Sequence, residues 1–251
     1  MITLTKVAPA AVRARREGKE MSRAICTIGA ALVVVVAALM SAVGVAEAST
    51  GPVRLQLLAE AQTNLLLSQY HGPPQAASPA KCNMGQNPEG VAGVFLLPTL
   101  SFGSGDLTFT CQVETGSVLV DLGGAVATED ARGDTWETAS GEVLLFTRAN
   151  LERICDDALR FFPAAAPATV DGNAVSGTQV STPAFTAKVI PPSGQLWQDS
   201  VDLGHPGKLA ASYCGWKAEV PLRQGRHVIR VDLSNVAGAS THFTYNITVT
   251  S

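Results

Sequence analysis

The sequence predicts a mainly β protein: an antiparallel two-sheet sandwich of about eight strands with one covering α-helix, plus an N-terminal signal helix. Several segments alternate apolar and polar residues with a period of two, whereas one well-defined segment, 147–162, has a helical period. We find no alternating strand–helix units, which a parallel sheet needs for its crossovers. Charged residues make up 16 % of the chain, below the roughly 25 % of average domains, as in many exported β proteins.

The first fifty residues have the pattern of a secretory signal. An uncharged run, 24–46, follows a group of basic residues, Arg13, Arg15, Arg16, Lys19 and Arg23. The run ends in Ala46-Glu47-Ala48, the small-x-small pattern that signal peptidase accepts. We therefore expect cleavage after Ala48 and a secreted, extracellular protein. The alternative is a retained membrane anchor, because residues 24–46 reach the length of about 20 residues that spans a bilayer.

The chain divides into three parts: a signal peptide (1–48), an N-terminal helix with a proline-rich linker (49–80) and a β-sandwich domain (81–251). The mature chain keeps 12 Lys and Arg against 18 Asp and Glu, a net charge of −6. A mildly acidic chain without a basic stripe is a poor partner for nucleic acid or anionic lipid. We expect a monomer that meets the membrane only through its signal segment.

Two helices are predicted in the mature chain. The first opens at Thr50-Gly51-Pro52 and ends before the linker "HGPPQAASPAKC" (71–82). The second is capped by Thr147 and stopped by Pro163, and its apolar residues form one stripe: Leu151, Ile154, Cys155, Ala158, Leu159 and Phe162. Because such a stripe must be covered, we expect this helix to pack on a sheet.

The strands follow in order. Residues 91–97 form a compact apolar run, and "LTFTCQVETGSVLVDL" (107–122) predicts a hairpin that turns at Glu114-Thr115-Gly116. Asp171-Gly172 predicts a second hairpin within "ATVDGNAV". The remaining alternating segments are "AFTAKVI" (184–190), "WKAEVPL" (216–222), "VIRVDL" (228–233) and "FTYNITV" (243–249).

Four cysteines remain after the signal, with Cys26, is removed: Cys82, Cys111, Cys155 and Cys214. An even number in an oxidising compartment predicts two disulfides, and no C-x-x-C is present for zinc or redox chemistry. Three pairings are possible, of which we favour Cys82 with Cys111 and Cys155 with Cys214. Cys111 shares the buried face of its strand with Leu107, Phe109 and Val113.

The order of short motifs resembles a group of secreted bacterial proteins, of actinobacterial type, for which no activity is established. The motifs are "CNMGQ" (82–86), "GVFLLP" (93–98), "CQVETGSVLVDLGG" (111–124), a helix with a cysteine, "ATVDGNAV" (168–175), "TPAFTAKVIP" (182–191) and "PLRQGRHVIRVDL" (221–233). The segment "RLQLLAEAQTNLLLSQY" (54–70) departs from the tryptophan-rich start of that group. The resemblance implies a β-sandwich fold and export, and it leaves the function open.

The sequence offers no catalytic or metal motif. It has neither G-x-S-x-G nor H-x-x-x-H, and the histidines are scattered: His71, His205, His227 and His242. Asp202, His205 and Ser212 lie close in sequence, but a polar loop explains them better than a triad does. We expect no cofactor, no metal and no catalytic residues.

The densest acidic stretch is "TEDARGDTWETASGE" (128–142). It lacks the spacing of a calcium loop, so a solvated loop is the preferred interpretation over weak calcium binding by its acids: Glu129, Asp130, Asp134, Glu137 and Glu142. Arg132-Gly133-Asp134 also spells the tripeptide that integrins recognise, which recurs by chance.

The tryptophans indicate where a ligand would bind. Trp216 shares a face with Ala218 and Val220 and is predicted to be core, whereas Trp136 and Trp197 are predicted to lie in long polar loops. Indole rings can stack on sugars, and Gln198 and Asp199 could bond to hydroxyls; plugging the end of the sandwich is the alternative role. The predicted function is a non-catalytic extracellular module that binds a carbohydrate or a cell-envelope component. The alternative is a secreted hydrolase whose site is assembled from loops.

Overall fold

The protein is mostly β, with three α-helices among the residues that the computed structural model describes. These residues are 2–3, 52–69, 93–97, 105–114, 116–189, 194–234 and 240–251. None of the described helices is long and apolar enough to cross a membrane. Of the predicted signal peptide (1–48) the structure describes only Ile2–Thr3, and Cys82 lies outside the described residues.

The first sheet is built around two long antiparallel strands, β4 and β11, which pair along most of their length. Its order is β1-β4-β11-β10, with β2 also on β4 and β9 also on β11. The bounds are β1 (Ile2–Thr3), β2 (Val94–Leu96), β4 (Ser117–Thr128), β9 (Thr178–Ser181), β10 (Phe185–Lys188) and β11 (Lys208–Pro221).

The second sheet has the order β3-β13-β12-β7-β8, and its central strands alternate buried and exposed residues. The bounds are β3 (Gly105–Val113), β7 (Ala168–Val170), β8 (Asn173–Ala174), β12 (Gly225–Ser234) and β13 (Ser240–Val249). A separate hairpin pairs β5 (Thr135–Glu137) with β6 (Val143–Leu145).

The two large sheets share an apolar cluster, which joins the first half of β4 and the last half of β11 to the inner face of the second sheet. Cys111 is buried in this cluster, as its strand position predicts. It is disulfide-bonded, and its partner lies outside the described residues. The pairing with Cys82 therefore stays a prediction.

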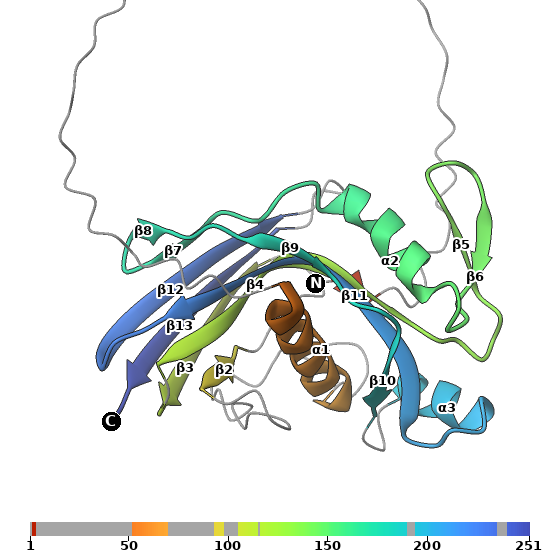
Figure 1. Cartoon of the computed structure of the whole chain (residues 1–251), viewed down its shortest axis with the longest axis horizontal. Helices are drawn as coiled ribbons and strands as arrows, with labels where there is room; N and C mark the ends of the chain where they lie inside the picture. The colour runs from red at the N-terminus through yellow and green to blue at the C-terminus, as the bar shows by residue number, and fades with distance from the viewer. Residues whose placement is uncertain are drawn as a thin grey trace, which may run out of the picture. The chain divides into compact units, whose positions relative to one another are not determined.

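A bulge bends the long strands at their middle. Leu122 and Gly123 of β4 lie opposite the single residue Trp216 of β11, and Gly123 has a φ of +108°. Beside it, a Cβ on Gly215 would lie 2.6 Å from the Cα of Gly124, so the two backbones approach more closely than side chains allow. Figure 1 shows the resulting curve of β11.

The helices cover opposite faces of the first sheet (Figure 1). Helix α1 (Pro52–Gln69) packs on the inner side of the curve, whereas α2 (Leu151–Ala158), with a 3₁₀ turn at Leu159–Phe161, covers the other side. The Cys155–Cys214 disulfide joins α2 to β11, which confirms that favoured pairing. Helix α3 (Gly194–Asp202) precedes β11.

Several expectations were wrong in detail. The sheets are mixed rather than antiparallel, because β1 and β2 pair with β4 in parallel and β3 pairs with β13 in parallel. The segments β3 and β4 belong to different sheets and form no hairpin, which fits β4 being buried on both faces while β3 alternates. The helix expected at 147–162 is shorter and begins after Asn150 rather than Thr147. The Asp171-Gly172 hairpin is confirmed.

Candidate functional site

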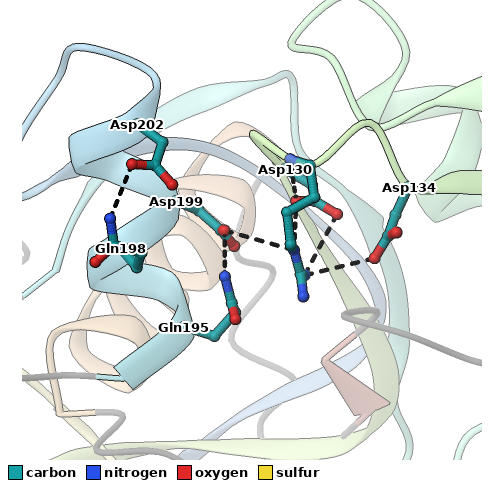
Figure 2. A network of polar contacts seen from close by, with 7 residues as sticks. Asp130, Asp134, Gln195, Gln198, Asp199 and Asp202 are labelled. Carbon is teal, nitrogen blue, oxygen red and sulfur yellow. Dashed lines mark hydrogen bonds and ion pairs between the residues drawn. The ribbon is translucent and has the colours of Figure 1, made fainter.

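Two polar segments far apart in sequence meet at one end of the first sheet. The loop 129–134 follows β4, and α3 precedes β11, whose first residues pair with the end of β4 in the register Ala211–Thr128. The antiparallel pairing therefore brings the acidic loop and α3 together. Figure 2 shows the polar network that links them.

Arg132 is the centre of this network. Its Nε lies 3.0 Å from Asp130 Oδ1 and 3.7 Å from Asp199 Oδ1, and its Nη2 lies 3.5 Å from Asp134 Oδ2 (Figure 2). The backbone N–H of Arg132 also donates to Asp130 Oδ1 at 2.8 Å. Burial alone would raise the pKa of the Asp130 carboxyl, but these bonds from Arg132 lower it below its usual value. The guanidinium is thus held in one orientation while 31 % of its side chain remains exposed.

Helix α3 contributes two i, i+4 pairs. Gln195 Nε2 donates to Asp199 Oδ1 at 2.5 Å, and Gln198 Nε2 donates to Asp202 Oδ1 at 2.8 Å. Asp199 is fully buried, and its Oδ2 has no hydrogen-bond partner among the described residues. Burial raises the pKa of this carboxyl, and the charge of Asp130 adds to the effect.

The cluster Asp130–Arg132–Asp134–Gln195–Asp199 offers fixed donors and acceptors rather than a metal site. No group of His, Cys, Asp or Glu in the described part of the chain has an arrangement that could hold a metal ion. An arginine fixed between carboxylates, with an amide beside it, matches the alternating donors and acceptors of vicinal hydroxyls. The tripeptide Arg132-Gly133-Asp134 is folded back on itself by the Arg132–Asp134 ion pair.

The structure places Trp136 in strand β5 rather than in a loop, and only 7 % of it is exposed. Its Nε1 donates to Asp157 Oδ2 at 2.7 Å, and its ring meets the edge of Phe161 and the guanidinium of Arg160. The indole therefore contributes to the packing of the β5–β6 hairpin on α2.

Trp197 lies in α3, where the sequence also predicted a loop. A Cβ on Gly207 would lie 3.2 Å from its ring, and the half-buried indole packs against the apolar cluster beneath α1. Helical geometry puts Trp197 about 200° around the axis from Gln195, whereas Asp199 returns to the same side as Gln195. The structure thus brings Asp199 to the cluster and directs Trp197 elsewhere.

The other acids of the predicted loop have separate roles. Glu129 Oε2 accepts from the backbone N–H of Ala210 at 2.9 Å, and Glu142 forms an ion pair with Arg153. Glu137 lies exposed in β5. Within the part of the chain that the structure describes, none of these three carboxylates bonds to the cluster.

Asp202, His205 and Ser212, for which the sequence favoured a polar loop over a triad, do not assemble into one. Ser212 is buried and donates to Thr182 O, whereas His205 is exposed in its turn and Asp202 bonds to Gln198. His227 bonds to Asp171 Oδ2 at 2.7 Å through Nδ1. Trp216 is half-buried against the shared core, and its Nε1 donates to Phe162 O.

A second polar network, absent from the sequence-based expectations, lies beneath α1. Lys217 Nζ is 2.9 Å from Asp121 Oδ2, donates to Gln62 Oε1 at 2.5 Å and sits 4.0 Å from the ring centre of Tyr213. Tyr213 Oη donates to Asp121 Oδ1 at 3.2 Å. The signals in the sequence are weak: Asp121 is the one charged residue of β4, and Lys217 is one of three in β11. All of these groups are buried, so the network fixes α1 on the sheet and is not open to a ligand.

No protein-family model, no curated protein and no solved structure matches the chain.

Proposed function

We propose that this protein is an exported, non-catalytic module that binds a carbohydrate of the cell envelope through the cluster Asp130–Arg132–Asp134–Gln195–Asp199. The observation that carries the proposal is the partly exposed guanidinium of Arg132, oriented by carboxylates from two segments. A preformed set of planar polar groups loses little conformational freedom on binding, which favours recognition of neutral hydroxyl-rich ligands.

Export is part of the proposal. The N-terminal pattern of basic residues, apolar run and Ala46-Glu47-Ala48 supports it, and so does the Cys155–Cys214 disulfide, which persists in oxidising compartments. The mature protein should then begin at Ser49. Mass spectrometry of the secreted protein tests this, and recovery only from membranes with residues 24–46 intact would contradict it.

The ligand-binding residues differ from those that the sequence favoured. Asp199 stays in the proposed site, Gln198 lies beside it on α3, and Gln195 is added. Trp136 and Trp197 are left out, because both rings pack against apolar neighbours. The proposed recognition therefore depends on hydrogen bonds rather than on stacking.

A glycan array, followed by calorimetry on the best ligand, tests the proposal. Arg132→Gln should weaken binding at least about tenfold, because one charge-assisted hydrogen bond contributes about 1.5–3 kcal/mol. Arg153→Gln is the matched control, since it removes an exposed arginine from another carboxylate pair. Binding that is unchanged in Arg132→Gln, or lost equally in both variants, would refute the assignment.

One cluster favours the alternative of a secreted hydrolase. Ser240 Oγ lies 3.4 Å from His242 Nε2, and His242 Nδ1 lies 2.8 Å from Asp232 Oδ1, the order of contacts in a serine triad. The side chains of His242 and Asp232 are 53 % and 61 % exposed, whereas such triads work in water-excluded sites. Labelling by a fluorophosphonate, abolished in Ser240→Ala and kept in Ser234→Ala, would establish the hydrolase instead.

A further inference from the structure

The outward face of the second sheet is open and polar along its three longest strands. In register across β3, β13 and β12 lie four rows of side chains. These rows are Asp106–His242–Asp232, Thr108–Thr244–Arg230, Thr110–Asn246–Val228 and Gln112–Thr248–Arg226. Nearly all of them are exposed, and Thr244 is half-buried. Nothing in the described ranges covers this face.

Three exposed arginines gather on β12 and the turn before it: Arg223, Arg226 and Arg230. None has a carboxylate partner within the residues that the structure describes. This contrasts with the other arginines there, which are ion-paired or, for Arg148, hydrogen-bonded: Arg54, Arg132, Arg148, Arg153 and Arg160. The patch is a local positive surface on a chain whose mature part is acidic.

The neighbours of these arginines are hydroxyl and amide groups. Arg230 pairs across the sheet with Thr244, and Arg226 with Thr248. The two arginines share one face and are four residues apart, about 13 Å along an extended strand. The acidic residues of the face, Asp106 and Asp232, lie beside His242 at its other end. An anionic ligand is therefore directed to the half that holds Arg226.

We infer that this face binds a carboxylate-bearing polysaccharide, which runs along β12 from Arg230 toward Arg223. An exposed arginine–carboxylate pair contributes little by itself, so a ligand with repeating charges is needed to engage several arginines at once. The threonines and amides beside them can bond to sugar hydroxyls. This surface shares no residue with the cluster around Arg132, so it is a second binding site.

Nucleic acid fits the face less well. Single strands bind through aromatic platforms beside the positive charges. The aromatic residues of these strands, Phe109, Phe243 and Tyr245, point inward and are buried in the shared core. The outward rows contain none.

Calorimetry with polygalacturonate tests the inference, with dextran as the neutral polymer and an oligothymidylate as the nucleic acid. The wild type should bind polygalacturonate at low salt and more weakly at high salt. Dextran should not bind at this face, so any binding of dextran should be unchanged when the arginines of the face are replaced. The double variant Arg226→Gln/Arg230→Gln should lose at least about tenfold in affinity. Arg148→Gln/Arg153→Gln removes the same charge elsewhere and should bind as the wild type does.

Three outcomes would overturn the inference: no binding of polygalacturonate by the wild type, equal losses in the two double variants, or binding of oligothymidylate without polygalacturonate. Because both altered side chains are exposed, urea midpoints equal to that of the wild type will show that the variants remain folded. A failure here leaves the Arg132 proposal intact, since that site is tested with Arg132→Gln.

Discussion

Replacing Lys217 with Met tests whether the buried network under α1 is a true ion pair. The side chains of Lys217 and Asp121 are 0 % and 3 % exposed, so neither charge can be screened by water. The pKa of Lys217 is lowered by burial, although the nearby Asp121 acts to raise it. Removing the cation leaves the Asp121 carboxylate uncompensated, and we expect the free energy of unfolding to fall by about 3–5 kcal/mol.

A double-mutant cycle gives the magnitude of the pair itself. Asp121→Asn keeps an acceptor for Tyr213 Oη and the backbone N–H of Gly123, so it removes mainly the charge. In Lys217→Met/Asp121→Asn no unpaired charge remains, and the loss should be smaller than the sum of the single losses by about 1–3 kcal/mol. Urea unfolding followed by circular dichroism, with the disulfides intact, measures each free energy.

Arg54→Met is the matched control, because Arg54 also joins α1 to β11 by pairing with Glu219 but is 46 % exposed. Its loss should be about 0–1 kcal/mol. The reasoning would be refuted if Lys217→Met cost no more than Arg54→Met, or if the two single losses in the cycle were additive. Either result would mean that the pair is not held as charges in the core.

Three further predictions concern the Cys155–Cys214 disulfide, the buried face of α2 and the His227–Asp171 pair. Cys155→Ala/Cys214→Ala should lower the free energy of unfolding in urea by about 4 kcal/mol, because the bridge closes a loop with a sequence separation of 59 residues. Ile154→Ala, at a fully buried position of α2, should cost about 2–5 kcal/mol in the same assay, and Leu159→Ala less, because Leu159 is only partly buried. Burial lowers the pKa of His227, but the bonds to Asp171 and to Arg223 O outweigh it and raise the pKa overall. The stabilisation of the fold by protonated His227 is therefore present below about pH 6.5 and is lost as the pH rises through the raised pKa. Between about pH 6 and about pH 9 the urea midpoint of the wild type should therefore fall more than that of His227→Gln. His205→Gln is the control and should behave as the wild type does. An equal fall of the midpoint in all three proteins would contradict this.

Much of the strand content could be predicted, because period two marks a half-buried strand wherever one face meets water. β12 and β13 alternate in the sequence and in the structure. Pairing could not be predicted, since the pattern gives the face of a strand and not its neighbour or direction. The parallel partnership of β3 with β13 depends on a contact between residues more than a hundred positions apart.

The candidate site was only half predictable. The sequence marked the acidic loop around Asp130 and the segment with Gln198 and Asp199, but it gave no sign that Arg132 and Asp199 would lie 3.7 Å apart. The sequence predicted a loop where α3 lies, so it placed Trp197 beside Asp199. Helical periodicity would have placed Gln195, rather than Trp197, on the same side of the helix as Asp199.

The two polar networks described above differ in their exposure to solvent. The Lys217–Asp121 network and the Arg132 cluster contain similar side chains, but the first is sealed beneath α1 and the second leaves a third of its guanidinium side chain open to water. A sealed network can only specify where α1 packs, because any ligand would first have to displace the helix. In the Arg132 cluster the buried Oδ2 of Asp199 has no hydrogen-bond partner among the described residues, and the partly exposed arginine beside it is already oriented. Because Asp199 is itself fully buried, the group that a ligand hydroxyl can reach is the oriented guanidinium of Arg132, and the sealed network presents no such group.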